Sequence, residues 1–297
     1  MNEIFRRAMV DGMRAGGLDP AAVADIVDRA LDEDLGPQRL DVTSVATIPA
    51  DQTDTADLVA RADGVVAGLW VAAAVFASAS GGAVEVTLHA ADGQPVVRGD
   101  VLASVAGPTR ALLTAERTVL NLLCRMSGVA THTRAWAEVL DGTGATVLDT
   151  RKTTPGLRIL EKYAVRAGGG ANKRMGLYDV AMIKDNHKLA AGSISAAYER
   201  IRETFPDVPV QVEVTTVQEA LEAVGVGSTF LLCDNMSPTL LREVVKAVDG
   251  RAELEATGGL TLEVAREYAL TGVDYLSVGA LTHSSPILDI ALDLRPR

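Results

Sequence analysis

The second half of the chain repeats one pattern, in which a short run of β-forming residues ends on a polar residue or glycine. Six such runs occur, near residues 147, 181, 211, 230, 252 and 275. Stretches with helical spacing, such as SISAAYERIRETF and SPTLLREVVKAV, separate the last five runs. Strands that alternate with helices predict right-handed parallel crossovers, so this half is expected to be α/β.

The residues that end these runs favour a barrel over an open sheet. A barrel gathers every strand end around one mouth, whereas an open sheet uses only the ends at its switch point. In this chain, charged residues, threonine or glycine occur at the carboxyl ends of all six strands. We therefore expect an incomplete (β/α) barrel with at least six and fewer than eight parallel strands, and the residues at its mouth are Arg151, Lys152, Lys184, Glu213, Asp234, Thr257 and Gly279.

The first half shows a different pattern. Residues 20–35 have the apolar spacing of a helix, and the segments LVARADGVVAGL, AVEVTLHAADG and VVRGDVLASVAG resemble short strands joined by glycine-containing turns. This region predicts an antiparallel arrangement. From Thr114 to about Leu140 the pattern is helical again, with Thr114 as the expected N-cap.

Composition narrows the class of protein. The 297 residues are 48% hydrophobic and 23% charged, which is typical of a soluble globular protein. No apolar run approaches the roughly 20 residues of a membrane helix, and the N-terminal sequence lacks the apolar stretch of a secretory signal. The two cysteines, Cys124 and Cys233, are too few for a disulfide framework. We expect a cytoplasmic protein with no membrane partner.

Charge is distributed unevenly. The chain has a net charge of −11, which argues against a nucleic-acid partner. Residues 151–188 nevertheless hold nine Lys or Arg against three Asp or Glu, and they include five of the chain's six lysines. These cations are interleaved with glycine and apolar residues, so they predict an anion-binding site. The run Gly168–Gly170 is expected to let the backbone approach the anion.

Particular residues suggest how an anion is held. Arg151 offers a planar fork for a carboxylate and Lys152 a point charge for a phosphate. Glu213 and Asp234 end consecutive strands, where they could hold Mg²⁺, bond ribose hydroxyls or neutralise lysines. Two further turns follow the last two strands and are expected to bind phosphate, with a histidine just beyond: Thr257-Gly258-Gly259, Val278-Gly279-Ala280 and His283.

Several longer motifs resemble a known family. ERTVLNLLCRMSGVAT, DTRKTTPGLRILEKYAVRAGGG, GLYDVAMIKDNH, LLCDNMSP, EATGGL and LSVGALTHSS are similar to those of the quinolinate phosphoribosyltransferases. The resemblance implies an N-terminal α/β sandwich domain over 1–115 and a (β/α) barrel catalytic domain over 116–286, with the tail 287–297 on the first domain. It also implies a Mg²⁺-dependent pentosyltransferase of NAD biosynthesis, which converts quinolinate and 5-phosphoribosyl-1-pyrophosphate into nicotinate mononucleotide, CO₂ and pyrophosphate.

The resemblance assigns roles to individual residues. It implies that Arg117, Arg151, Arg174 and Lys184 bind quinolinate, and that Arg117 reaches into the site of the second subunit of a homodimer. The phosphoribosyl donor is expected at Lys152, Glu213, Asp234, Thr257–Gly259, Val278–Ala280 and His283. Thr150 and Lys173 complete the expected substrate contacts, and many members of the family have histidine where this chain has Lys173. The expected catalytic residues are Lys152, Lys184, Glu213 and Asp234, the last two also as metal ligands.

Two other interpretations stay open at this point. A related barrel phosphoribosyltransferase could act on another ring acid. A lysine Schiff-base aldolase would use Lys184 as nucleophile, which requires burial to lower the pKa of that lysine.

Overall fold

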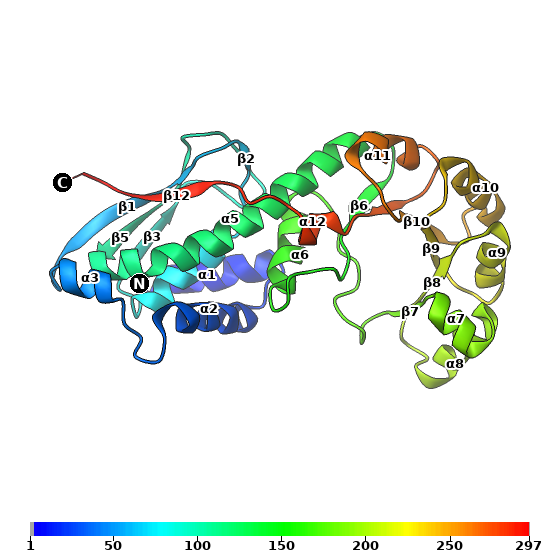
Figure 1. The fold of residues 1–297 in the computed structure, drawn as a ribbon, viewed down its shortest axis with the longest axis horizontal. Helices are drawn as coiled ribbons and strands as arrows, with labels where there is room; N and C mark the ends of the chain where they lie inside the picture. The colour runs from blue at the N-terminus through cyan, green and yellow to red at the C-terminus, as the bar shows by residue number, and fades with distance from the viewer. Residues whose placement is uncertain (1–2, 297) are drawn as a thin grey trace. The chain divides into compact units, whose positions relative to one another are not determined.

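The computed structural model describes residues 3–296, which divide into two compact units (Figure 1). The first unit contains the chain up to Arg134, the segment Thr154–Gly169 and the segment from Ser284 onward. The second contains Ala135–Thr153 and Gly170–His283. These units interleave along the chain, so they differ from the continuous ranges 1–115 and 116–286 expected from the sequence, which stay a prediction about domains.

An antiparallel sheet forms the centre of the first unit. Its strand order is β12-β1-β5-β3, with β12 spanning Ile290–Leu294, β1 Thr53–Ala60, β5 Val101–Pro108 and β3 Glu85–Leu88. The first and last strands of the chain pair directly, with Ala60 opposite Ile290 and Ala56 opposite Leu294. A two-stranded ribbon, β2 (Gly64–Val65) with β4 (Pro95–Val96), accompanies the sheet. The predicted antiparallel arrangement is confirmed.

Helices complete this unit. They are α1 (Glu3–Ala15), α2 (Pro20–Leu35), α3 (Val42–Thr47), α4 (Leu69–Ala79) and α6 (Arg158–Ala167), together with most of α5 (Thr109–Leu140). The predicted helix over 20–35 is confirmed, because Asp19 caps it, Pro20 opens it and Leu31 is fully buried. The sequence did not predict α4, whose residues are apolar on every side and show no helical period.

The long helix α5 begins earlier than predicted. Thr109 starts it, and Thr114 lies inside the helix, where its hydroxyl donates to Asp41 Oδ2 at 3.1 Å. The expectation that Thr114 caps the helix is therefore wrong. Thr109 is buried, and its hydroxyl donates to Asp54. Strand β5 runs directly into the helix at this residue, so the helix begins without a polar capping turn.

Six parallel strands form the second unit, in the order β6-β11-β10-β9-β8-β7 (Figure 1). The strands are β6 (Thr146–Leu148), β7 (Ala181–Ile183), β8 (Val210–Val214), β9 (Phe230–Asp234), β10 (Glu253–Thr257) and β11 (Tyr275–Ser277). Each is short and buried, as the apolar runs predicted. No ladder joins β6 to β7 among the described residues, so the six-stranded, incomplete barrel predicted from the sequence is confirmed.

Helices of the second unit follow the strands β7 to β11. They are α7 (Asp185–Ala191), α8 (Ile194–Thr204), α9 (Val217–Gly225), α10 (Pro238–Val248), α11 (Leu262–Ala269) and the short α12 (Ala280–His283). Ser193, Thr216 and Ser237 cap α8, α9 and α10 with their side-chain oxygens. Every crossover therefore returns to the same end of the sheet. Within residues 3–296, no helix combines the length and the apolar character that crossing a bilayer requires.

Gly168 and Gly169, which follow α6, do not form an anion-binding backbone segment. The N–H groups of Gly168 and Gly169 donate to carbonyls of α6, so they end that helix. A methyl group added to Gly168 would come within 2.4 Å of the Ala130 carbonyl oxygen. The expectation that the run Gly168–Gly170 approaches a ligand is wrong at these two positions, because close packing between α5 and α6 requires the glycine.

Candidate active site

A cavity of about 740 Å³ opens at the carboxyl ends of the parallel strands, within the second unit. All but one of the substrate contacts expected from the sequence line it, although they come from six strand ends and from the loop before β7, spread over 134 residues. The exception is Arg117. The expected residues that line the cavity are Thr150, Arg151, Lys152, Lys173, Arg174, Lys184, Glu213, Asp234, Thr257, Gly258, Gly259, Val278, Gly279, Ala280 and His283.

Two guanidinium groups, those of Arg151 and Arg174, line the cavity. Among residues 3–296, neither Arg151 nor Arg174 forms an ion pair. Arg174 donates to the carbonyl of Val180 at 2.9 Å, and the buried Nε of Arg151 has no hydrogen-bond partner in this part of the chain. Burial, followed by the charge of Arg151, lowers the pKa of Arg174. Two like charges held together in this way attract a dianion.

Lys173 is anchored at both ends. The fully buried carboxylate of Asp149 accepts from the Lys173 backbone N–H at 2.9 Å and from the Asn172 amide at 2.6 Å. The ammonium lies 2.6 Å from Oε1 of Glu255, and the two side chains are only 8% and 0% exposed. Burial lowers the pKa of Lys173 by more than the charge and hydrogen bond of Glu255 raise it. The lysine is thus fixed on the inner wall of the cavity.

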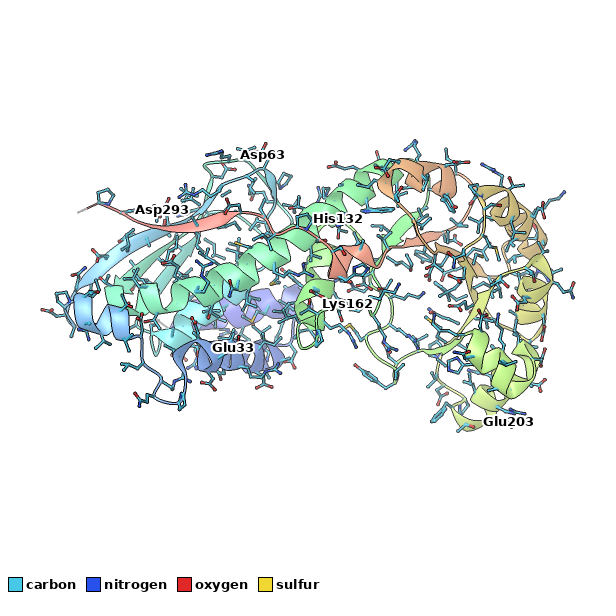
Figure 2. All side chains as sticks on the ribbon, in the orientation of Figure 1. Glu33, Asp63, His132, Lys162, Glu203 and Asp293 are labelled. Carbon is cyan, nitrogen blue, oxygen red and sulfur yellow. The ribbon has the colours of Figure 1, made fainter. Side chains whose placement is uncertain are left out.

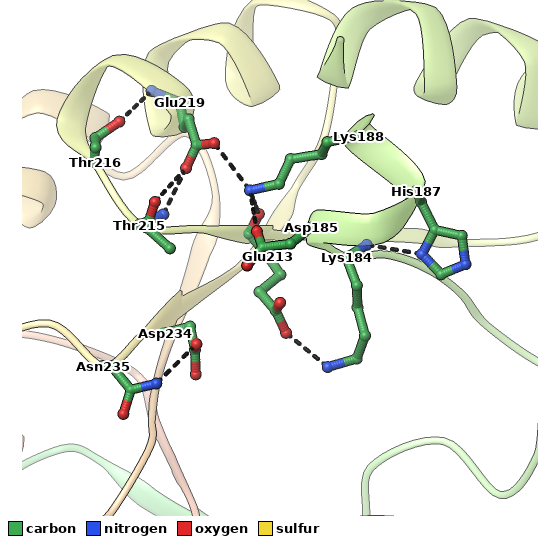
Figure 3. Close-up of polar contacts among 10 residues, drawn as sticks. All are labelled: Lys184, Asp185, His187, Lys188, Glu213, Thr215, Thr216, Glu219, Asp234 and Asn235. Atoms are coloured by element: carbon green, nitrogen blue, oxygen red, sulfur yellow. Dashed lines mark hydrogen bonds and ion pairs between the residues drawn. The ribbon is translucent and has the colours of Figure 1, made fainter. Parts of the chain in front are cut away.

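A second ion pair joins the neighbouring strand ends (Figure 3). Lys184 Nζ lies 2.6 Å from Glu213 Oε2, with the lysine side chain half-exposed and the carboxylate buried. His187 accepts from the Lys184 backbone N–H at 3.0 Å, which fixes the start of α7. Lys188 meets the Glu213 carbonyl oxygen, Asp185 and Glu219, and these contacts orient the strand end beneath the pair.

Asp234 retains an accessible carboxylate. Its Oδ2 accepts from the side-chain amide of Asn235 at 2.9 Å, and Asn235 adopts a left-handed backbone with φ 52° (Figure 3). Asn235 N–H donates to the Thr257 carbonyl oxygen at 2.9 Å. Gly258 has φ 101°, and a methyl group there would meet Asn235 Oδ1 at 2.2 Å, so only glycine fits this turn. Asp234 and the glycine turn therefore form one connected wall of the cavity.

Lys152 and His283 both lie close to Gly279. A methyl group on Gly279 would approach Lys152 Cδ to 3.0 Å and His283 Nε2 to 3.2 Å. The hydroxyl of Thr282 donates to the Lys152 carbonyl oxygen at 2.8 Å, which holds the strand end against α12. The Lys152 ammonium makes no ion pair among the described residues. It remains available to an anionic ligand.

Three side chains that build this site were not predicted from the sequence. Asp149 and Glu255 are fully buried, and Ser277 has a buried hydroxyl without a partner in the described residues. Glu255 and Ser277 line the cavity. Asp149 lies at the end of an apolar run, so its position at a strand end was the one available signal. Glu255 alternates with apolar residues in ELEAT, as exposed residues of a strand often do, and Ser277 is a single polar residue in an apolar run, so neither carries a comparable signal.

Both cysteines, His132 and Arg117 lie outside the cavity lining. Cys124 and Cys233 are buried free thiols, and burial raises the pKa of Cys233 to about 12. His132, labelled in Figure 2, forms a 2.8 Å hydrogen bond with Ser285, and burial lowers its pKa. Arg117 is exposed on α5 in the first unit. Arg117 does not line the cavity of its own chain, so its expected contact with substrate is not observed within a single chain.

Two family models match the chain. The model for the C-terminal domain of quinolinate phosphoribosyl transferase matches residues 129–293, and that for its N-terminal domain matches residues 41–127. The first match covers the whole cavity lining.

Several relatives are similar to this chain over almost its full length. The chain is 47% identical to the nicotinate-nucleotide pyrophosphorylase (carboxylating) of Mycobacterium leprae, over 92% of this chain and 97% of the relative. It is 44% identical to the probable enzyme of that name from Bacillus subtilis, over 88% and 90%. The solved structure of NadC from Streptococcus pyogenes has a TM-score of 0.89 at 36% identity, over 94% and 99%. The resemblance found in the sequence is confirmed: the chain belongs to the quinolinate phosphoribosyltransferase family.

Proposed function

We propose that this chain uses the cavity at its strand ends for the reaction of its family, phosphoribosyl transfer to quinolinate in NAD biosynthesis. The observation that carries the proposal is the pair Arg151 and Arg174, two guanidiniums that line the cavity and form no ion pair in the described residues. Quinolinate carries two carboxylates on adjacent ring carbons. Two fork-shaped donors supply matching charge and fix the orientation of the ring.

The donor binds on the opposite wall in this proposal. Lys152, with no ion pair in the described residues, faces the pyrophosphate, and the turns at Gly258 and Gly279 allow a phosphate close to the backbone. The ring nitrogen attacks C1 of the ribose as the bond from C1 to the pyrophosphate oxygen breaks, and pyrophosphate leaves with that electron pair. Lys152 stabilises the charge that develops on the leaving oxygen.

The positive charge on the ring nitrogen after the transfer promotes decarboxylation. Quaternised nitrogen accepts electron density, so the bond from C2 to its carboxylate breaks and CO₂ leaves. The electron pair remains on C2 and takes a proton from water. Arg151 and Arg174 act by holding the ring, and no protein nucleophile is required in this scheme.

The carboxylates of the cavity fit a divalent cation that enters with the donor. Asp234 has an accessible carboxylate, whereas Glu213 Oε2 already contacts Lys184. Among residues 3–296 no group of three or more acidic, histidine or cysteine side chains is arranged to hold a metal ion by itself. Mg²⁺ is commonly held by one or two carboxylates plus phosphate oxygens, and it would offset the negative charge of the pyrophosphate. We assign this role first to Asp234, with Glu213 nearer to the ribose hydroxyls.

Arg117 belongs in this proposal to the site of a second subunit. It is exposed, and it makes no ion pair among the described residues. A homodimer in which α5 presents Arg117 to the neighbouring cavity would add a further cation for quinolinate. The cytoplasmic location expected from composition likewise stays a prediction.

Mixed dimers test the shared site. Arg117→Ala chains and Lys184→Ala chains, each inactive alone, should regain part of the activity after subunit exchange, because one of the two cavities then has both cations. Well-exchanged mixtures without recovery, with both parents folded, would contradict the shared site.

The Schiff-base alternative receives no support from the geometry. A nucleophilic lysine has to be desolvated and uncharged. Lys184 is half-exposed and forms an ion pair with Glu213.

Substrate selectivity tests the proposed function directly. Nicotinate lacks the 2-carboxylate, so it would leave one guanidinium without a partner, and we expect kcat/KM to fall by roughly 10⁴ relative to quinolinate. The assay follows pyrophosphate release with each acid, with and without the phosphoribosyl donor. Comparable turnover of nicotinate would refute the assignment.

A further inference from the structure

The ion pair between Lys173 and Glu255 has no clear structural purpose. Both side chains are almost completely buried. Buried ion pairs contribute little net stability, because desolvation offsets the attraction, and apolar side chains often serve equally well. A pair retained inside a cavity therefore calls for a role in what the cavity binds.

Glu255 is only half satisfied. Its Oε1 accepts from Lys173, whereas its buried Oε2 has no hydrogen-bond partner in the described residues. Ser277, on the adjacent strand β11, also presents a buried hydroxyl without a described partner, and both residues line the cavity. Buried polar atoms are nearly always paired in the working state of a protein. Unpaired atoms at this depth indicate that the inner wall is completed by a ligand or a water molecule.

Glu255 favours the charged form of Lys173. Burial lowers the pKa of this lysine, as do the charges of Lys184 and Arg174, whereas the charge and the hydrogen bond of Glu255 raise it. Asp149 accepts from the backbone N–H of Lys173, and the charge of Glu255 also raises the pKa of the buried Cys233. Loss of Glu255 would therefore remove a close contact that holds this ammonium in place and favours its charged form.

We propose that Glu255 is a positioning residue of the reaction, which holds the Lys173 ammonium on the inner wall so that it donates a hydrogen bond to quinolinate. This inference rests on the proposed function. Lys173 is the group that touches the substrate, and Glu255 acts through it. The pair then works as one unit, and the effect of Glu255 on quinolinate depends on the presence of Lys173.

The test compares Glu255→Gln with Glu253→Gln. Glu253 lies on the same strand two residues earlier, is exposed, and contacts Tyr275 outside this cavity, so it is a matched control. KM for quinolinate, KM for the donor and kcat are measured from pH 6 to pH 9. In Glu255→Gln the lysine loses a carboxylate that favours its charged form, so KM for quinolinate should increase about tenfold or more as the pH rises. KM for the donor should change less than about twofold.

A second variant separates positioning from structure. Lys173→Gln/Glu255→Gln carries no titratable pair, so its KM for quinolinate should be raised but independent of pH. Equal increases of both KM values, or a pH-independent KM in Glu255→Gln, would overturn the proposal. If Glu255→Gln does not fold, Glu255→Asp takes its place: the charge remains but the carboxylate retracts, so a raised, pH-independent KM supports positioning and an unchanged KM refutes it.

A wrong proposed function would give a different experimental result from a wrong role for Glu255. If the function is wrong, the unaltered chain itself would neither bind nor turn over quinolinate, and the role of Glu255 would be refuted with it. An active parent whose variants behave alike refutes only the positioning role.

Discussion

Each unit contains a buried glutamate that forms an ion pair, and the two glutamates differ in how completely their carboxylate oxygens are hydrogen-bonded. Glu161 in the first unit accepts from Arg125 Nε and Nη2 and from the backbone and hydroxyl of Thr154, so both of its oxygens are used. Glu255 in the second unit accepts from Lys173 alone and keeps one oxygen without a described partner. Both carboxylates are fully buried.

The difference indicates how a structural ion pair is distinguished from a functional one. A carboxylate with every acceptor site used has nothing left for a ligand, and its removal leaves a charge and several donors unpaired. A carboxylate with a free acceptor site in a cavity is incomplete until something binds. Completeness of hydrogen bonding, rather than burial, therefore separates the two roles.

The largest expected effect concerns the satisfied pair. Glu161→Ala would leave the Arg125 guanidinium and the Thr154 N–H without their partner, and we expect the free energy of unfolding to fall by about 3–5 kcal/mol. Urea denaturation measures this change. The exposed control Glu199→Ala should stay within about 0.5 kcal/mol of the parent. A loss below about 1 kcal/mol in Glu161→Ala would break the comparison.

The next effect concerns ligand binding. Arg151→Ala and Arg174→Ala should each weaken quinolinate binding by about 1.5–3 kcal/mol, because each removes a charge-assisted hydrogen bond, and should leave donor binding nearly unchanged. Calorimetric titration of both ligands provides the measurement, with the exposed Arg202→Ala as control. Equal weakening of both ligands would disprove the assignment of these arginines to the ring.

The sequence predicted most of this cavity because its chemistry lies at strand ends. Arg151, Lys184 and Asp234 each follow an apolar run, and parallel strands bring their carboxyl ends to one side. The periodic pattern thus determined both the barrel and the set of residues at its mouth.

The partners of these cations were not predictable in the same way. Lys173 and Glu255 are 82 residues apart, and Glu255 alternates with apolar residues in ELEAT, as exposed residues of a strand often do. Their pairing depends on strand register and on how far each side chain extends inward. Helix α4 and the start of α5 were missed for a related reason, since tertiary burial there replaces the local capping and period that sequence analysis uses.

A third effect extends the comparison from side chains to the backbone. Gly258 and Gly259 both have positive φ, but a methyl group would collide with Asn235 only at Gly258 and would meet nothing within 4 Å at Gly259. We expect Gly258→Ala to weaken donor binding by about 2 kcal/mol and Gly259→Ala by about 1 kcal/mol, the strain of a left-handed alanine. Calorimetry with the phosphoribosyl donor distinguishes them, and identical losses would show that the turn is not the donor wall.

The smallest effect concerns Asp92, a carboxylate that is hydrogen-bonded but has no cation. It accepts from Tyr163 Oη at 2.5 Å and from Leu69 N–H at 3.0 Å, and burial raises its pKa above the ordinary value of 3.8. The folded state therefore holds a proton on Asp92 more readily than the unfolded state does. This contribution to stability is fully present below the ordinary pKa and is lost as the pH rises through the folded pKa.

Asp92→Asn should remove that loss. The amide keeps an acceptor for Leu69 N–H but does not titrate, so at neutral pH we expect a change in unfolding free energy of about 1 kcal/mol or less. The difference between variant and parent should become more favourable to the variant as the pH rises above about 4. Denaturation between pH 4 and pH 8 measures this difference, in which the opposite contributions of Asp41, Asp57 and Asp179, whose pKa values are lowered, cancel. A difference that does not depend on pH would mean that hydrogen bonds alone satisfy this carboxylate as fully as Arg125 and Thr154 satisfy Glu161.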